Sequence, residues 1–312
     1  MSAPTFSIVV PTYNRASQLE VCLKAIARLN YPKDAFEVVV VDDGGKRPLD
    51  TLVERTLSGV DYTLLRQANA GPGAARNAGV DAAKGLYVAF TDDDCAPRED
   101  WLTALKKRID LNPNAAVAGR TCNALTKNIY SFSSQMLVDY LCEYYNRDQG
   151  AGFATTSNIA MPRDRFLAMG GFARAFRSAA GEDRDLVDRW TGAGRKLVYS
   201  PDAVVWHRHH LNLFSFAKQH LNYGKAARRF HHLRRARRGE KPSIEGLGFY
   251  WGILAYPYRK HVTAPALKVS ALMALSQIMN AAGFVFESTP RGPEPQEPDA
   301  EHPSEPSPRR AV

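Results

Sequence analysis

The sequence predicts an α/β fold, with a mostly parallel central sheet in its first two-thirds and a helical extension after it. Three short apolar runs, at residues 6–10, 36–41 and 86–90, have the composition of strands buried on both faces. Apolar residues recur at helical spacing within 19–29 and 99–111. Strands that alternate with helices are typical of parallel sheets, which bind ligands at the carboxyl ends of their strands.

Composition divides the chain into three parts. Residues 1–210 form the predicted α/β domain, with a first half at 1–119 and a less regular second half at 120–210. Residues 211–286 are helical, basic and aromatic in character. Residues 287–312 hold seven of the chain's 19 prolines, with Glu, Ser and Arg. We expect this tail to be disordered, because it has too little apolar surface to offset the entropy of ordering it.

The formal net charge of +9 is concentrated in one segment. Between Lys225 and Lys241 the chain carries eight basic residues and a single acid, Glu240, whereas the charges elsewhere nearly balance. A general nucleic-acid-binding surface is therefore not expected.

The four cysteines show no Cys-x-x-Cys spacing, which disfavours a disulfide framework or a zinc knuckle. The N-terminus enters a strand pattern without a basic segment and an apolar stretch, so we expect no signal peptide. These two features predict a cytoplasmic protein.

Acidic and turn-forming residues follow the predicted strands. The first run is followed by Pro-Thr-Tyr-Asn-Arg at 11–15, the second by Asp-Asp-Gly-Gly at 42–45, and the run at 86–90 by Thr-Asp-Asp-Asp at 91–94. Carboxylates that meet at one sheet edge repel one another unless a cation lies between them, and their oxygens suit Mg²⁺ or Mn²⁺. The alternative is a set of solvated Asp turns, which three successive strand ends disfavour.

These segments, with Gly-Pro-Gly-Ala-Ala-Arg-Asn-Ala-Gly at 71–79 and Gly-Glu-Asp at 181–183, resemble the family 2 glycosyltransferases of GT-A fold. The resemblance extends from Phe6 to about His210 and depends on the order and spacing of the segments. It implies an inverting enzyme with a metal ion and a nucleotide-sugar donor. UDP would be the first carrier to consider, with GDP and dTDP open. The half at 1–119 would bind the nucleotide, and the half at 120–210 the acceptor.

The resemblance also implies a donor site. Thr12 and Tyr13 would line the nucleobase and ribose pocket, and Asp43 would contact an edge of the base. Arg76 would reach the nucleotide or its phosphates, and pairing with an acid is the alternative. The full set of donor-binding residues would be Pro11, Thr12, Tyr13, Arg15, Asp43, Arg76, Asp92 and Asp93.

A metal site and a general base follow from the same resemblance. Asp92 and Asp94 would form the DxD element, with Asp94 on the metal and Asp92 facing the sugar or ribose hydroxyls or also the metal. His207 matches a late histidine that ligates the metal in some relatives, although His209, His210 or none could do so.

Asp183 would be the catalytic base that accepts the proton of the acceptor hydroxyl in a single displacement with inversion. Glu182 could be the base in its place, or an orienting partner whose charge raises the pKa of its neighbour.

Other functions fit less well. The segment at 71–76 lacks the third glycine of a dinucleotide fingerprint and does not follow the first strand. A processive polysaccharide synthase is disfavoured, since Leu186 stands where the Gln of Gln-x-x-Arg-Trp would be. The apolar stretch at 269–286 contains polar residues that weaken it as a membrane span. A different class of function is a non-catalytic scaffold that binds a nucleotide or an anionic polymer.

The basic segment has two interpretations. A basic amphipathic helix with aromatic residues would hold the protein on the inner, anionic face of a membrane. The alternative is a solvated helix that closes over the acceptor site. A glycan or lipid-linked acceptor, in cell-envelope glycan or glycolipid synthesis, is the expected partner.

Overall fold

The computed structural model describes residues 3–146, 152–176, 180–239, 245–260 and 265–287. Structural statements below concern these residues. Apart from Glu287, the tail predicted to be disordered lies outside them, as do residues 240 and 241 of the basic segment.

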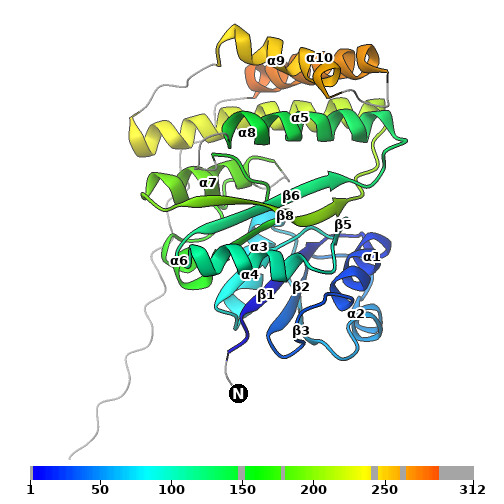
Figure 1. Cartoon of the computed structure of the whole chain (residues 1–312), viewed down its shortest axis with the longest axis vertical. Coiled ribbons are helices and arrows are strands. Elements are labelled where there is room, and N and C mark those ends of the chain that lie inside the picture. Colours follow the sequence, from blue (N-terminus) through cyan, green and yellow to red (C-terminus); the bar gives the residue numbers. More distant parts are fainter. Residues whose placement is uncertain (1–2, 147–151, 177–179, 240–244, 261–264, 288–312) are drawn as a thin grey trace, which may run out of the picture.

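One eight-stranded sheet forms the centre of the described structure (Figure 1). Its strands are β1 (Phe6–Thr12), β2 (Phe36–Asp42), β3 (Asp61–Arg66), β4 (Tyr87–Phe90), β5 (Cys95–Pro97), β6 (Ala116–Asn123), β7 (Ile159–Pro162) and β8 (Leu197–His207). Their order is β3-β2-β1-β4-β7-β6-β8-β5. The first four run in parallel, as do β6 and β8, whereas β7 and β5 are antiparallel to their neighbours. The mostly parallel sheet is therefore confirmed. Leu86, predicted as a buried strand residue, precedes β4 and is 62% exposed.

Helices cover both faces of the sheet and add a further layer. They are α1 (Ala16–Ala27), α2 (Asp50–Thr56), α3 (Pro72–Ala82), α4 (Trp101–Leu111), α5 (Ile129–Tyr145), α6 (Arg163–Ala168), α7 (Glu182–Gly192), α8 (Leu213–Arg238), α9 (Leu247–Arg259) and α10 (Ala266–Phe286). Successive strand side chains point to opposite faces, so Ile8 packs in the core under α1, α2 and α4, and Val9 in the core under α3, α6 and α7. The half at 120–210 is more regular than its sequence suggests.

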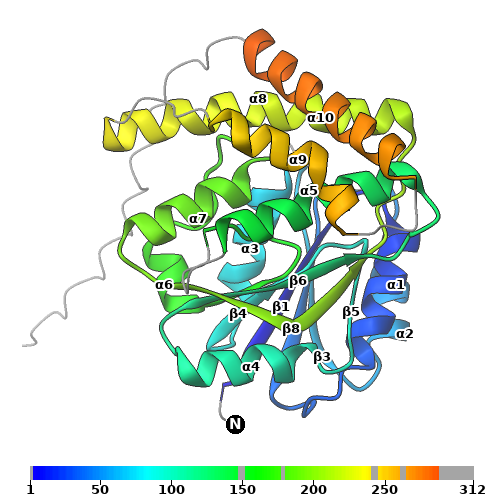
Figure 2. The ribbon, with the colours of Figure 1, turned by 45° about the horizontal axis from the view of Figure 1, so that its top comes forward.

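Helices α5, α8, α9 and α10 form a further layer, which stacks over the edge of the sheet where the parallel strands end (Figures 1 and 2). Its core joins α5, α9 and α10 through residues such as Tyr140, Ile253 and Met273. Helices α8 and α10 touch through glycines. A Cβ atom at Gly224 would overlap the backbone of α10, and one at Gly283 would overlap the backbone of α8. The two helices therefore approach at backbone distance.

The basic segment does not form the free cationic face that its sequence suggests. Arg237 and Arg238, at the end of α8, pair with acids of α7, and Arg229 pairs with Glu287 beyond α10. The expectation is wrong for these arginines because the last turns of α8 lie beside α7 and the rest of α8 packs along α10, which places acids within their reach.

Candidate active site

The carboxyl ends of β1, β2, β4 and β8 and the first turns of α3 and α7 surround one cavity of about 1350 Å³. The parallel topology explains this convergence, because the strand ends meet at one edge. All of the predicted site residues line the cavity: Pro11, Thr12, Tyr13, Arg15, Asp43, Arg76, Asp92, Asp93, Asp94, Glu182, Asp183 and His207.

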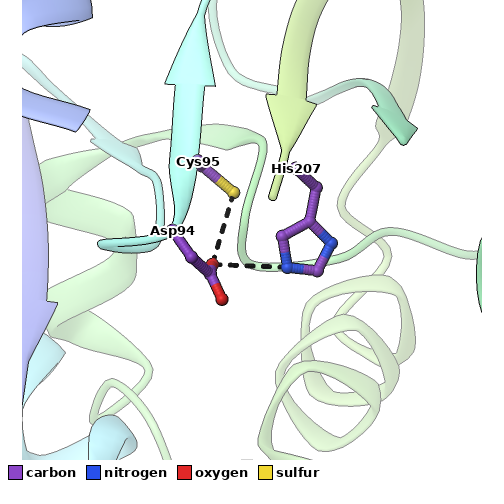
Figure 3. Close-up of side chains that lie close together, drawn as sticks. All are labelled: Asp94, Cys95 and His207. Atoms are coloured by element: carbon purple, nitrogen blue, oxygen red, sulfur yellow. Dashed lines mark hydrogen bonds and ion pairs between the residues drawn. The ribbon is translucent and has the colours of Figure 1, made fainter. Parts of the chain in front are cut away.

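Asp94 and His207 meet at this edge (Figure 3). The Asp94 Oδ1 atom lies 3.3 Å from His207 Nε2, and the Cys95 Sγ atom lies 3.9 Å from the same oxygen. The strand register causes the meeting, since Cys95 on β5 stands opposite His207 on β8. Among the described residues, these three side chains form the one group with metal-ligand spacing, and it includes neither His209 nor His210.

The electrostatics favour a charged pair at this position. Burial opposes ionisation of His207, but the hydrogen bond to Asp94 and its charge outweigh burial and raise the pKa of His207. Burial likewise opposes the Asp94 carboxylate, but His207 and then Arg15 hold the pKa of Asp94 below its usual range.

A divalent cation fits this donor set. A buried carboxylate and an imidazole nitrogen suit Mn²⁺ better than Mg²⁺, which prefers oxygen ligands throughout. Asp94, in the turn before β5, and His207, at the end of β8, would hold the ion. Because Arg15 Nη2 lies 2.8 Å from Asp94 Oδ2, the arginine would share that carboxylate with the ion.

Asp93 binds residues at the end of β1. It accepts hydrogen bonds from Thr12 Oγ1 at 2.7 Å and from Arg15 Nη1 at 2.8 Å, and it is 3% exposed. Burial outweighs the Arg15 charge and raises the pKa of Asp93 to about 7. Asp93 thus ties the first strand to the DxD loop, and direct donor contact by Asp93 stays a prediction.

Asp43 anchors the loop before α3. Its two carboxylate oxygens accept hydrogen bonds from the side chains of Gln67 and Asn69 and from the backbone N–H groups of Ala70 and Gly71. Four donors fill the usual capacity of a carboxylate. A contact of Asp43 with the base would therefore compete with the hydrogen bonds that hold this loop. That contact stays a prediction.

Arg76 links the two acidic parts of the site. It is 3% exposed, and its guanidinium donates to Asp92 at 2.6 Å and to Glu182 at 3.2 Å. Its helix begins after Gly71, whose φ of 92° favours glycine, so the chain can turn sharply into α3. Asp92 and Glu182 thus both bind the guanidinium of Arg76. This agrees with the alternative interpretation, in which Arg76 pairs with an acid.

Glu182 and Asp183 occupy the first turn of α7 and differ in their partners. Glu182 is 4% exposed and bound to Arg76. Asp183 is half-buried, and among the described residues it accepts one hydrogen bond, from the Arg184 N–H. Burial raises the pKa of Glu182 to about 7 and also raises the pKa of Asp183, although Arg76 opposes both shifts.

Sequence reasoning gave a helix that closes over the acceptor site as an alternative, but it assigned no site residue to α8. Gln219, His220 and Tyr223 of α8 line the cavity. The pattern that could have revealed His220 and Tyr223 is their spacing of three residues, which places both on one helix face.

Residues 7–176 match a family model described as "Glycosyl transferase family 2", which covers more than half of the 312 residues. The chain belongs to this family. Glu182, Asp183 and His207 lie beyond the matched segment.

Curated relatives of this glycosyltransferase differ in length. Glycosyltransferase AglE of Haloferax volcanii is 27% identical over 65% of this chain and 67% of AglE. The chondroitin synthase of Escherichia coli is 29% identical over 62% of the chain and 31% of the synthase. The pre-mycofactocin glycosyltransferase of Mycobacterium tuberculosis is 28% identical over 71% of the chain and 46% of that protein. The chain thus spans less than half of the latter two.

Solved structures share the fold of this glycosyltransferase. A mannosyltransferase from Pyrobaculum calidifontis in complex with GDP-Man and Mn²⁺ has a TM-score of 0.64 and 19% identity, over 90% of this chain and 88% of that one. Residues 1–349 of S. aureus TarS in complex with UDP-GlcNAc have a TM-score of 0.52 and 15% identity, over 90% and 89%. At these identities the likeness shows the fold alone, which is the GT-A type.

Proposed function

We propose that this protein is a metal-dependent, inverting glycosyltransferase that moves a sugar from a nucleoside diphosphate to a hydroxyl acceptor. One observation carries the proposal: the Asp94–His207 pair and the carboxylate of Asp183 line the same cavity. UDP is the first carrier to test, since TarS was solved with UDP-GlcNAc, and GDP is the second, given the GDP-Man complex of the mannosyltransferase.

The residues divide the reaction between them. Asp183 accepts the proton of the acceptor hydroxyl, whose oxygen bonds to the anomeric carbon as the bond from that carbon to the diphosphate breaks. Mn²⁺, when bound at Asp94 and His207, would neutralise charge on the departing diphosphate. Arg76 adds a buried positive charge next to Asp92 on the donor side.

Asp183 fits the role of the base better than Glu182. Glu182 is bound to Arg76 in the wall of the site, whereas the Asp183 side chain has no ion pair among the described residues. Glu182 would then orient Arg76, while burial and then the charge of Asp92 raise the pKa of Asp183.

The test is a donor-hydrolysis and transfer assay with UDP-sugars and GDP-sugars, with and without Mn²⁺. Mn²⁺-dependent release of UDP or GDP is the expected result. Binding of the nucleotide without turnover, in both the wild type and the Asp183→Asn variant, would support the scaffold alternative instead.

We further propose that the protein acts on the inner face of a membrane through α9 and α10, in cell-envelope glycan or glycolipid synthesis. Helix α10 is, within the part of the chain that the structure describes, the one helix apolar and long enough to cross a membrane, and 22% of its 18-residue window is buried. Both helices form the outermost layer (Figure 2). Their large exposed apolar residues are Leu247, Trp251, Tyr258, Leu267, Ile278, Val285 and Phe286.

Charge supports a lipid surface beneath these helices. Neither helix contains an acid, and Arg259, Lys260 and Lys268 are exposed at their adjoining ends. Apolar and aromatic side chains with a basic rim are typical of helices that lie in a membrane interface.

Co-sedimentation with vesicles of phosphatidylglycerol and phosphatidylcholine tests this surface. The double variant Trp251→Ser, Ile278→Ser should lose binding, whereas Leu111→Ser, which removes a 71% exposed residue from α4, should not. Salt should weaken the binding, because it screens surface charge. Failure of the wild type to sediment with vesicles would refute the membrane proposal and leave the transferase proposal intact.

A further inference from the structure

The cavity of the candidate active site continues well beyond the acids. Its far part, which we call the apolar lobe, lies among α5, α8, α9 and α10. Leu137, Leu141, Phe230, Phe249 and Phe284 line this lobe, and the polar residues Arg234, Glu245, Gln277 and Asn280 also line the cavity in this region of the chain. The five apolar side chains cannot contribute to binding a diphosphate or a metal, so they have no use in the donor chemistry described above.

A buried histidine lies at the entrance to the lobe. His220 is 1% exposed, and neither of its ring nitrogens has a hydrogen-bond partner among the described residues. Its ring packs against Phe216 at 4.4 Å and Tyr223 at 5.5 Å between centroids. Burial lowers the pKa of His220 to about 4, so the neutral ring offers one donor and one acceptor. Buried polar groups are nearly always satisfied, and a cavity wall is where a ligand would satisfy them.

Two neighbours of His220 extend this polar boundary towards the base. Gln219 donates to the Tyr223 hydroxyl at 2.8 Å, and its own Oε1 atom is buried without a partner among the described residues. Burial first, and then the charge of Asp183, raises the pKa of Tyr223, so its hydroxyl stays protonated beside the acids. The polar groups of Gln219, His220 and Tyr223 on α8 therefore lie in the same cavity as Asp183 of α7, at the edge of the apolar lobe.

We propose that the acceptor is amphipathic: its hydroxyl-bearing head lies between Asp183 and the polar groups of Gln219 and His220, and its hydrocarbon chain fills the apolar lobe. This inference rests on the proposed transferase function and narrows its acceptor to a lipid-linked class. Helix α8 is then a wall of the acceptor site.

The test uses a series of alkyl glycosides, from methyl to octyl, below their micelle concentrations. In the wild type, the acceptor KM should fall as the chain lengthens, by up to roughly fourfold for each methylene that becomes buried. Ala227→Phe, which fills the lobe from α8, should abolish this dependence while the donor KM is unchanged. Ala236→Phe, on the exposed end of the same helix, is the matched control.

His220→Phe tests the polar boundary separately. Phenylalanine keeps the ring and removes both unpaired nitrogens, so the fold should be retained. The acceptor KM should rise about tenfold, the effect of one lost hydrogen bond, with Mn²⁺-dependent UDP binding unchanged. An unchanged acceptor KM in this variant would overturn the role of His220.

Binding of octyl glycoside without donor, measured by calorimetry, separates the two proposals. Donor hydrolysis without octyl glycoside binding, or a KM independent of chain length, would overturn the amphipathic acceptor and leave the transferase function standing. Binding that Ala227→Phe removes, in a protein that hydrolyses no donor, would support the lobe and refute the transferase.

Discussion

Arg237 of α8 donates a 2.7 Å hydrogen bond to Asp185 of α7, a carboxylate with no exposed surface. Arg189 donates to the other oxygen of Asp185 from within α7. Asp185 follows Asp183 by two residues, so the end of α8 fixes the helix that presents the proposed base. The basic segment thus supports the site from within the protein.

Replacing Arg237 with alanine should therefore destabilise the protein. We expect the free energy of unfolding to fall by about 1.5–3 kcal/mol, the usual value of a hydrogen bond to a charged group. The loss should not be larger, because Arg189 still pairs with Asp185 in the variant. Urea unfolding measures it. Arg235→Ala removes an exposed arginine of the same helical turn and should change the free energy of unfolding little. Equal effects of the two variants would contradict the structural role of Arg237.

Asp94→Asn should weaken Mn²⁺ binding, because an amide supplies no negative charge to the ion. We expect thermal stabilisation by UDP to lose its dependence on Mn²⁺, with UDP binding in EDTA unchanged. Asp81→Asn removes an exposed carboxylate of α3 and serves as the control. Retention of the Mn²⁺ effect in Asp94→Asn, as measured by differential scanning fluorimetry, would rule out Asp94 as a ligand.

Asp183→Asn should lower kcat by about 10²–10⁴, the range for loss of a positioned general base, with the donor KM nearly unchanged. Glu182→Gln should have a smaller effect on kcat, since Glu182 is bound to Arg76. Single-turnover kinetics with saturating donor would measure both. The reverse order of effects would transfer the role of base to Glu182.

The rate should fall as the pH is lowered towards the raised pKa of the Glu182–Asp183 pair. Burial raises the pKa of Glu182 to about 7 and also raises the pKa of Asp183, and a protonated carboxyl cannot accept the acceptor's proton. The two groups interact, so the apparent pKa belongs to the pair. Glu182→Gln removes one negative charge and should shift the acid limb of the kcat profile to lower pH. A flat profile between pH 5 and 8 would falsify this account.

Strand ends explain why most of the site could be predicted from sequence. Asp43 and Asp94 follow apolar runs that could only be buried strands, and the parallel topology brings such ends together whatever the loops do. The proximity of Asp94 to His207 could not be derived from strand ends alone. It depends on the register in which β5 pairs with β8, which no local sequence pattern specifies.

Partners across α7 and α8 were not predictable from sequence. A run of arginines has the same appearance whether it faces solvent or distant acids, and Asp188 is recognised as a partner of Arg234 and Arg238 only once both helices are placed. The same limit hid the four hydrogen bonds of Asp43, two of which come from backbone groups.

The crossing of α8 and α10 should tolerate no added carbon. Gly224→Ala would force a methyl group into the backbone of α10, and we expect a cost of about 1–3 kcal/mol, typical of overpacking. Gly248→Ala, at a position with open space, is the matched control. Thermal unfolding of both variants would measure the difference, and equal midpoints would contradict this contact.

Those paired glycines also bear on how new substrate preferences could evolve in this architecture. The backbones of α8 and α10 are in contact at Gly224 and Gly283, so the distance between the two helices is fixed. Substitutions at these glycines therefore cannot tune that distance without disrupting the contact. Mutations that change the shape of the apolar lobe would instead fall at neighbouring small residues such as Ala227 and Ala281. Single substitutions there alter the volume of the lobe and leave the spacing of α8 and α10 unchanged. Descendants of this protein would diversify by changing the lining of the cavity while keeping its frame.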